Sequence, residues 1–261
     1  MTPDRNEECR ALVTKARRIL CDIDGCLIRG DSPIDGAAAF VRSVADKLVL
    51  VSNNSTDTAA TLSLRLSRIG LPVPESRLFL AGEQTLLHLK ATLGRPRIML
   101  IATDTIRSRA AQLGFDLTPD RPDLVVLCRA PHARVMEIEA ALGQIIRGVP
   151  AVAANPDVTH PGPTGPAIET GALVHMLGAC HPGLSMPIIG KPEPSLFHRA
   201  LQGIGIEHAV MIGDNSETDI AGARRLGMSS ILVHPDRRFG RTIADLVVPS
   251  DEERRFQQTV V

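Results

Sequence analysis

Short runs of Val, Ile and Leu alternate along the chain with segments whose apolar residues recur every three or four positions. Nearly continuous apolar runs are typical of parallel strands covered on both faces. Several of the helical patterns end at Gly, as helix C-termini often do. The predicted strands are residues 18–21, 47–52, 97–103, 123–128, 187–191, 209–214 and 230–234, and the predicted helices include 58–69, 134–146, 194–203 and 218–226. This alternation predicts an α/β fold.

Two stretches interrupt the alternation. Residues 81–82 are Ala-Gly, and a Gly- and Pro-rich path runs from residue 155 to 166 and on to 182–183. We expect loops and domain boundaries in both. With 261 residues and 44% hydrophobic content, the chain can hold one large α/β domain or a core with a smaller inserted domain.

The first apolar run ends in two acids, Asp22 and Asp24, followed by Gly25. Residues i and i+2 of a strand share a face, so both carboxylates should emerge at the carboxyl edge of the sheet, where open α/β sheets bind ligands. Gly25 lets the backbone turn away. Taken alone, this segment fits an ordinary turn as well as it fits an active site.

Three later apolar runs also end in polar residues. Ser-Asn-Asn at 52–54 offers a hydroxyl, amides and backbone N–H groups before a helix, which suits an anion, although a helix cap is the simpler alternative. Lys191 is either a cation at a strand end or a solvated surface side chain. Asp214 and Asp219 repeat the paired acids, and Asp219 alone could be a carboxylate favoured at a helix start.

Together these strand ends indicate more than turns and caps. If the strands are parallel neighbours, Asp22, Asp24, Ser52, Lys191 and Asp214 meet at one edge of the sheet. Crowded carboxylates repel, and a hard divalent cation with oxygen ligands, Mg²⁺, would neutralise them. Lys191 and a helix N-terminus would balance a bound phosphate dianion. We therefore expect a phosphoryl-transfer site.

Composition narrows the class of partner. Lys plus Arg and Asp plus Glu number 29 each, so no net charge favours nucleic acid or an anionic membrane surface. The N-terminal segment is charged and no apolar run approaches the length of a membrane span, so we expect a cytoplasmic protein. The five cysteines show no metal-ligand spacing and are expected to be reduced.

The four polar elements together resemble the signature of the haloacid dehalogenase superfamily of aspartate-nucleophile phosphatases. They are DxDG at 22–25, Ser-Asn-Asn at 52–54, Gly-Lys-Pro at 190–192 and GDxxxTD at 213–219. Phrases at 29–37, 155–157 and 171–173 look like those of the class IIA subgroup, which includes p-nitrophenyl, nucleotide, pyridoxal and phosphoglycolate phosphatases. The resemblance implies a Rossmann-like parallel-sheet core, residues 1–80 and 185–261, with a smaller α/β cap domain inserted at 81–184.

The resemblance also implies a role for each acid. Asp22 would be the nucleophile that forms an aspartyl-phosphate, and Asp24 would protonate the leaving oxygen and then deprotonate the attacking water. The metal ligands would be Asp22, Asp24 through its backbone carbonyl, and Asp214. Asp219 would support the metal or its bound waters without being a direct ligand.

The remaining elements would hold the phosphoryl group. Ser52, Asn53 and Asn54 would bind it, and Lys191 would offset the charge of the nucleophile and the phosphate. Cys26 stands where the superfamily often has Thr.

Substrate choice is assigned to the inserted domain. Candidate specificity residues on its predicted loops are Arg129, His132, Asn155, Asp157 and His160, although each could be a turn or surface residue. The chain has no Trp or Tyr and six Phe, so it offers little aromatic surface for stacking a base or a pyridoxal ring. We therefore favour a sugar or polyol phosphate over a nucleotide or pyridoxal phosphate.

Two further points stay open. A non-catalytic phosphate-binding or regulatory protein could use the same fold, although the second acid, Asp24, would then have no evident duty. The resemblance also implies a homodimer formed through the cap.

Overall fold

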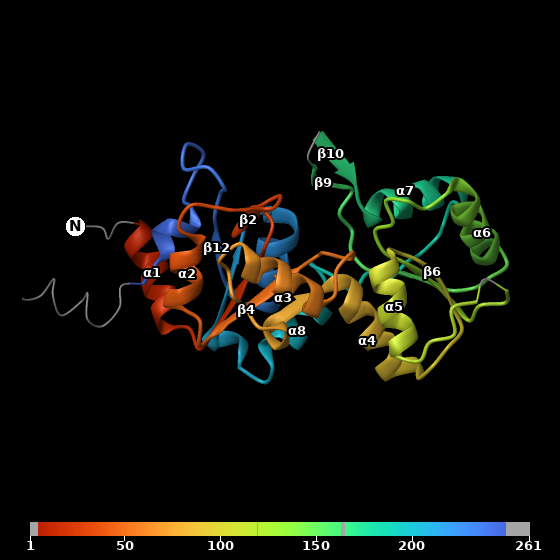
Figure 1. Cartoon of the computed structure of the whole chain (residues 1–261), viewed down its shortest axis with the longest axis horizontal. Coiled ribbons are helices and arrows are strands. Elements are labelled where there is room, and N and C mark those ends of the chain that lie inside the picture. The colour runs from red at the N-terminus through yellow and green to blue at the C-terminus, as the bar shows by residue number, and fades with distance from the viewer. Residues whose placement is uncertain (1–4, 119, 163–164, 249–261) are drawn as a thin grey trace, which may run out of the picture. The chain divides into compact units, whose positions relative to one another are not determined.

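The computed structural model describes residues 5–118, 120–162 and 165–248. These residues form two compact units (Figure 1). Unit 1 contains the described residues up to Val51, Ser63–Leu78 and those from Phe197 onward, and unit 2 contains Ser52–Leu62 and Phe79–Leu196. The core and cap boundaries expected from the sequence, at 80/81 and 184/185, stay a prediction.

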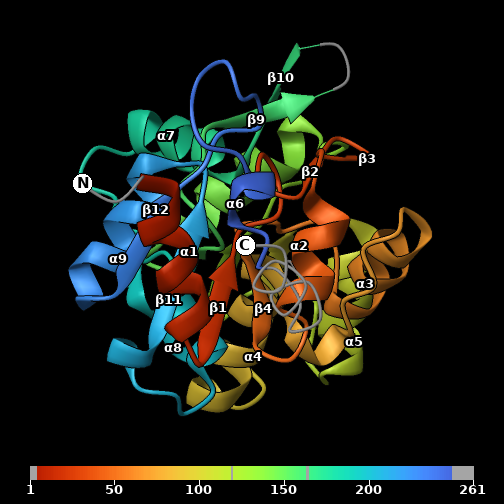
Figure 2. The ribbon, with the colours of Figure 1, turned by 90° about the vertical axis from the view of Figure 1, so that its left-hand side faces the viewer.

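A five-stranded sheet forms the centre of unit 1. Its order is β12-β11-β1-β4-β5, and Figure 2 shows the first four of these strands side by side. β1 pairs in parallel with β11 and β4, and β11 pairs in parallel with β12. β4 and β11 are buried along their whole length, which explains their continuous apolar sequences. The strands are β1 (Arg18–Cys21), β4 (Leu48–Ser52), β5 (Leu78–Leu80), β11 (Ala209–Gly213) and β12 (Ser229–Leu232).

One helix precedes β1, and others occupy the segments between the strands. The predicted helix at 218–226 begins as a π-helix at Ser216–Ile220, in which the N–H of Ile220 donates to the carbonyl of Asn215 at 3.3 Å. The Asn215 side chain caps this turn by accepting hydrogen bonds from the N–H groups of Glu217 and Thr218. The helices are α1 (Arg5–Lys15), α2 (Ala37–Ser43), α3 (Ala59–Arg68), α8 (Pro194–Leu201) and α9 (Ala221–Leu226), with shorter turns at Glu75–Arg77, Ile206–His208 and Ile243–Leu246; a small hairpin pairs β2 (Ile28–Arg29) with β3 (Ser32–Pro33).

Unit 2 has its own three-stranded parallel sheet, in the order β6-β7-β8. Its elements are α4 (Ala81–Leu93), β6 (Ile98–Ile101), α5 (Asp104–Gln112), β7 (Leu124–Leu127), α6 (Val135–Ile146), β8 (Ala151–Ala153), an antiparallel hairpin of β9 (Thr159–Gly162) and β10 (Gly165–Ile168), and α7 (Thr170–Cys180). Side chains of the three parallel strands pack with those of α6 and α7 in one buried cluster that includes Val125, Leu127, Ala141, Ile145 and Leu177.

The apolar run at 187–191 does not join the five-stranded sheet, contrary to the expectation that Lys191 ends one of its strands. Ile188 instead makes a single parallel bridge to Ala153, at the end of β8. The N–H of Gly190 donates to the carbonyl of Ala154 at 2.8 Å. Prolines at 187 and 192 lack an N–H and so cannot extend the ladder on either side.

The irregular stretches also contain more structure than expected. Residues 81–82 open α4, and the path to residue 183 contains β9, β10 and α7. Gly171 lies in the first turn of α7 because a Cβ there would collide with the carbonyl of Pro156. Its role is close packing against a neighbouring loop, not the ending of a helix.

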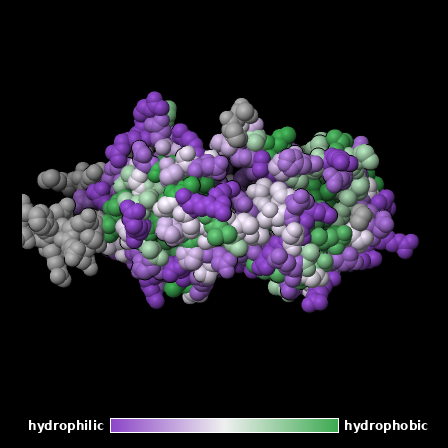
Figure 3. All heavy atoms as spheres, viewed as in Figure 1, coloured by the Kyte–Doolittle hydropathy of each residue, from purple (hydrophilic) through white to green (hydrophobic). Residues whose placement is uncertain are grey.

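Polar residues predominate on the face drawn in Figure 3, with smaller hydrophobic areas between them. Some large hydrophobic side chains are nevertheless exposed, among them Val135, Met136 and Ile146 on α6. Within the described residues, no helix combines the length and the apolar character that a membrane crossing requires.

Candidate active site

The two acids of the first motif lie at the carboxyl edge of the five-stranded sheet, as the sequence predicts. The Asp22 N–H continues the ladder beyond β1 by donating to the carbonyl of Ile212 at 2.9 Å. The Asp22 side chain is buried, whereas Asp24 is exposed. Gly25, at φ +77°, then turns the chain away. One carboxylate is therefore held rigidly at the sheet edge while the other can meet solvent.

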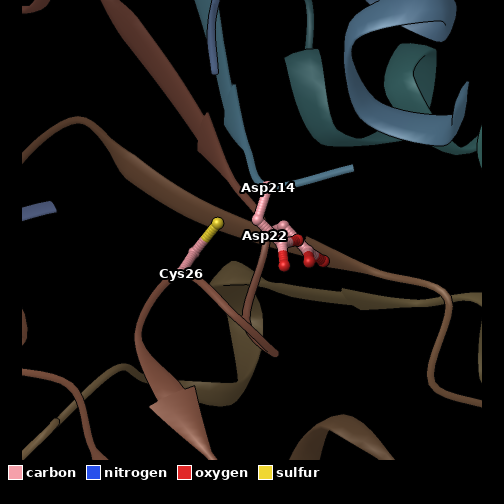
Figure 4. Close-up of side chains that lie close together, drawn as sticks. All are labelled: Asp22, Cys26 and Asp214. Carbon is pink, nitrogen blue, oxygen red and sulfur yellow. The ribbon is translucent and has the colours of Figure 1, made fainter. Parts of the chain in front are cut away.

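Asp214 brings a third carboxylate to this edge, because it follows β11, the parallel neighbour of β1. A carboxylate oxygen of Asp22, one of Asp214 and the Sγ of Cys26 all lie within 4.8 Å of one another (Figure 4). Carboxylates this close repel unless a proton or a cation neutralises them. Mg²⁺ prefers oxygen ligands and is often held by one or two carboxylates, so Asp22 and Asp214 fit this ion.

Cys26 completes the group without being a ligand suited to Mg²⁺. Burial raises the pKa of its thiol well above the usual range, and the nearby Cys21, Asp22 and Asp214 raise it further. A neutral thiol is a poor partner for a hard cation. We therefore assign the metal to the carboxylates, and Cys26 to the packing beside them.

Asp219 is fully buried and braces the loop that carries Asp214. Its Oδ2 accepts a hydrogen bond from the N–H of Asn215 at 3.1 Å. Gly213 is required at the end of β11, because a Cβ there would collide with the Asp219 carboxylate. Asp219 is not one of the three residues whose ligand atoms gather, and its contacts suit a supporting role.

Gly25 offers a test of this geometry. A Cβ at Gly25 would collide with the Asp214 carboxylate, in addition to the strain of placing a side chain at φ +77°. Gly25→Ala should cost about 1–3 kcal/mol of unfolding free energy and displace Asp214. We expect urea unfolding to show the loss, and the Mg²⁺ concentration that half-saturates activity to rise.

Gly30→Ala is the matched control for Gly25→Ala. Gly30 also has a positive φ, +59°, but nothing lies within 4 Å of the place that a Cβ would take there. It should lose a similar amount of backbone stability and keep its Mg²⁺ dependence. An equal change of Mg²⁺ dependence in both variants would contradict the placement of Asp214.

The second motif forms a tight loop after β4. Ser52 Oγ accepts from the N–H of Asn54 at 3.1 Å. Asn54 Oδ1 accepts from the N–H groups of Thr56 and Asp57, both at 2.9 Å, and its Nδ2 donates to the Asp57 carboxylate at 3.0 Å. The Asn54 side chain therefore shapes the loop, in the manner of an Asx turn. Ser52 is left as the hydroxyl of the predicted phosphate loop, residues 52–54.

Asn53 ties this loop to Lys191, another residue of unit 2. Its Nδ2 donates to the Lys191 carbonyl at 3.0 Å, and its Oδ1 accepts from the Lys191 N–H at 2.8 Å. Gly190 permits this approach, because a Cβ there would press on the Asn53 Oδ1. The structure thus brings Ser52, Asn53 and Lys191 together within unit 2, and the Asn53 amide positions Lys191, whose side chain is buried.

The candidate specificity residues fall into three places in unit 2. Asn155 is fully buried, and Asp157 donates its N–H to Asn155 Oδ1 at 3.1 Å. His132 is exposed and lines an open pocket of about 260 Å³ at the ends of β6 and β7. Arg129 and His160 meet at an acid that sequence reasoning did not single out, Glu169.

Glu169 is the centre of this third group. One oxygen, Oε1, lies 3.4 Å from Arg129 Nε and 3.1 Å from His160 Nδ1. The other, Oε2, accepts from the N–H of Thr170 at 3.1 Å, so Glu169 caps α7. Burial raises the pKa of Glu169 to about 7, and burial also lowers the pKa of His160. The sequence could have singled out Glu169 as an acid directly before a helix, which suggests a helix cap. That pattern does not reveal its Arg and His partners.

The raised pKa of Glu169 predicts a pH-dependent stability. Between the ordinary carboxyl value of 4.5 and about 7 the folded chain binds the proton more tightly than the unfolded chain, so this group's contribution to stability falls as pH rises through that window. The rise of the pKa from 4.5 to about 7 corresponds to a loss of about 3 kcal/mol. Glu169→Gln should flatten the curve of unfolding free energy against pH and make the protein more stable than wild type at pH 8.

Glu139→Gln, which removes an exposed acid on α6, is the control for Glu169→Gln. We expect it to leave the pH curve as it is in the wild type. A Glu169→Gln curve that keeps the wild-type slope between pH 5 and 7 would show that Glu169 is ionised throughout.

The chain is similar to known families and to known proteins. A model described as haloacid dehalogenase-like hydrolase matches residues 19–116, and a second, described as HAD-hydrolase-like, matches residues 188–244. The chain is 33% identical to a dihydroxyacetone phosphatase of Corynebacterium glutamicum, over 82% of this chain and 79% of that protein. It is 29% identical to the ribonucleotide monophosphatase NagD of Escherichia coli, over 83% and 87%.

Solved structures show the same fold. A 4-nitrophenylphosphatase from Thermotoga maritima superposes with a TM-score of 0.83 at 25% identity, covering 90% of this chain and 98% of that one. A glycerol phosphate phosphatase from Mycobacterium tuberculosis, solved in complex with magnesium, gives 0.82 at 24% identity, over 90% and 78%. The chain therefore belongs to the haloacid dehalogenase-like hydrolase family, as one of its class IIA phosphatases.

Proposed function

We propose that this protein hydrolyses a small hydroxylated phosphomonoester, a sugar or polyol phosphate, with Mg²⁺ as cofactor and an aspartyl-phosphate on Asp22 as intermediate. The observation that carries the proposal is the gathering of the Asp22 and Asp214 carboxylates at the carboxyl edge of the parallel sheet. Mg²⁺ held by these acids would screen their charge and that of the phosphate, which lets an anionic nucleophile approach an anionic substrate.

The two acids of the first motif divide the chemistry. An Asp22 carboxylate oxygen attacks phosphorus, the ester P–O bond breaks, and Asp24 gives its proton to the departing oxygen. Water then attacks the aspartyl-phosphate, Asp24 takes a proton from it, and the bond between phosphorus and Asp22 breaks to release phosphate. Burial of Asp22 and exposure of Asp24 support this division, since the second acid must reach both the leaving group and water.

The phosphoryl group would be held by Ser52, the backbone of the phosphate loop, and Lys191. A cation in a buried position is costly unless an anion faces it, so the burial of Lys191 supports a role opposite carboxylate and phosphate charge. Asn53 and Asn54 would serve through the backbone that their side chains hold in place. Such fixed charges and donors are the main source of catalysis in phosphoryl transfer.

The polar cluster of Arg129, His160 and Glu169 would contact the organic part of the substrate. It offers donors and an acceptor suited to hydroxyl groups, and it has no Phe, Tyr or Trp ring on which a base or pyridoxal ring could stack. The names of two relatives, a dihydroxyacetone phosphatase and a glycerol phosphate phosphatase, point the same way. The ribonucleotide monophosphatase among the relatives keeps a nucleotide as the alternative substrate.

A homodimer formed through the cap remains part of the proposal. The exposed hydrophobic side chains Val135 and Met136 on α6, 70% and 74% exposed, support it. Light scattering at several concentrations would measure the mass in solution.

Phosphate release from a panel of esters tests the proposed function. Glycerol and sugar phosphates, pyridoxal phosphate, nucleotides and p-nitrophenyl phosphate are each assayed with Mg²⁺ and with EDTA. Polyol or sugar phosphates should give the highest kcat/KM, and EDTA should abolish release. If nucleotides gave the highest kcat/KM, the substrate would be a nucleotide and not a sugar or polyol phosphate. If no ester in the panel released phosphate, a phosphate-binding protein without turnover would be favoured.

A further inference from the structure

A buried polar network joins the phosphate loop to the start of α7 inside unit 2. Its centre is Asn155, which is fully buried. The Asn155 Nδ2 donates to the carbonyl of Asn53 at 2.7 Å and lies 3.3 Å from both Ser55 Oγ and Thr170 Oγ1. Buried amides and hydroxyls that satisfy one another in this way fix a single arrangement of the chain.

The same network is closed by two further hydrogen bonds. Ser55 Oγ and Thr170 Oγ1 lie 3.1 Å apart, and the N–H of Arg129 donates to Ser55 Oγ at 2.9 Å. Ser55 and Thr170 are both buried. Three segments that are far apart in the sequence, near residues 55, 129 and 155–170, are therefore held at one point.

The Asn155 contact continues toward the groups that would hold phosphate. The carbonyl that Asn155 binds belongs to Asn53, whose side chain clamps the backbone of Lys191 by two hydrogen bonds. Loss of the Asn155 donor would leave the Asn53 carbonyl buried without that partner, which costs about 1–3 kcal/mol and favours a shifted loop. The side-chain amide of Asn155 thus connects the start of α7 to the backbone beside Ser52, and the side-chain amide of Asn53 extends the connection to Lys191.

We infer that Asn155 is a positioning residue for phosphate binding: it sets the Ser52–Asn53 loop, and through Asn53 the place of Lys191, without touching the substrate. This inference rests on the proposed function, and it replaces direct substrate contact as the role of Asn155. Two observations support the inference: the Asn155 side chain is fully buried, and its amide is hydrogen-bonded within the protein.

A double-mutant cycle between Asn155 and Ser52 tests the inference. Kinetics with p-nitrophenyl phosphate and calorimetric binding of inorganic phosphate, both with Mg²⁺, are measured for Asn155→Ala, Ser52→Ala and the double variant. Asn155→Ala should lower kcat/KM by about tenfold or more and weaken phosphate binding. Because Asn155 acts through the loop, the double variant should lose much less than the product of the two single losses.

Matched hydroxyl variants guard against a loss of folding. Thr170→Val removes one member of the network and should weaken phosphate binding in the same direction as Asn155→Ala. Thr85→Val removes an equally buried hydroxyl that donates to the Ala81 carbonyl of its own helix, and it should leave kinetics and phosphate binding as in wild type. If Asn155→Ala does not fold, the cycle of Thr170→Val with Ser52→Ala decides the question.

Independent losses in the cycle, or a folded Asn155→Ala that binds phosphate as the wild type does, would overturn the inference. If the protein is not a phosphatase, the result is different from a failure of this inference. In that case the wild type releases no phosphate from any ester, while the binding of inorganic phosphate still reports whether Asn155 positions the loop.

Discussion

Asp22→Asn should abolish turnover while the protein stays folded. The amide cannot attack phosphorus, and no other carboxylate of the described site occupies the buried position at the end of β1. Removal of a nucleophile commonly costs on the order of 10⁴-fold or more in kcat. The change keeps the size of the side chain and the hydrogen bond from the backbone N–H of residue 22 to the Ile212 carbonyl. The melting temperature should therefore stay within a few degrees of the wild-type value.

Phosphate release under saturating substrate measures this loss, and circular dichroism confirms the fold. Asp31→Asn is the control, because Asp31 is an exposed acid nearby in the chain, on the β2–β3 hairpin. It should keep wild-type activity. A folded Asp22→Asn variant with activity within about tenfold of wild type would rule out Asp22 as the nucleophile.

Asp24→Asn should separate the two halves of the reaction. Loss of a general acid costs about 10²–10⁴-fold when the leaving oxygen needs a proton, as in a polyol phosphate. p-Nitrophenolate leaves without one, so the first half-reaction should persist with p-nitrophenyl phosphate. Water attack on the aspartyl-phosphate still requires the base, and the variant should stall at that intermediate.

Stopped-flow absorbance at the p-nitrophenolate band detects this behaviour. Asp24→Asn should give a burst of about one p-nitrophenolate per chain, followed by slow turnover. Asp22→Asn should give no burst. If Asp24→Asn lost equal activity toward p-nitrophenyl phosphate and polyol phosphates and showed no burst, Asp24 would not be the acid and base.

The parts of the site that the sequence predicted are those at the ends of buried parallel strands. β4 and β11 are buried along their whole length, so their sequences are apolar throughout, and the first polar residues mark the sheet edge. Asp22 and Asp214 lie there because β1 and β11 are parallel neighbours, which the apolar runs indicated. At these positions the end of an apolar run, which marks the end of a strand, coincides with a carboxylate that can bind a metal.

The contacts made over long sequence distances could not be predicted in this way. The role of Asn53 in phosphate binding stays a prediction, and the bond between its amide and the backbone of Lys191, 138 residues away, has no local signal. Lys191 itself follows a bridge to β8 instead of a core strand. Burial raises the pKa of Glu169, and no local pattern records that burial or the contacts of Glu169 with Arg129 and His160. Side-chain partners depend on tertiary packing, and one sequence carries little trace of them.

Trapping the covalent intermediate tests the central claim most directly. The protein is mixed with a ³²P-labelled polyol phosphate and Mg²⁺, quenched in acid within milliseconds, digested, and the labelled peptide identified by mass spectrometry. We predict label on the peptide that contains Asp22, lost in Asp22→Asn and in EDTA. With ³²P-labelled p-nitrophenyl phosphate, whose leaving group needs no proton, the label should accumulate in Asp24→Asn. Label on another residue, or full turnover with no labelled peptide in any variant, would contradict the aspartyl-phosphate mechanism.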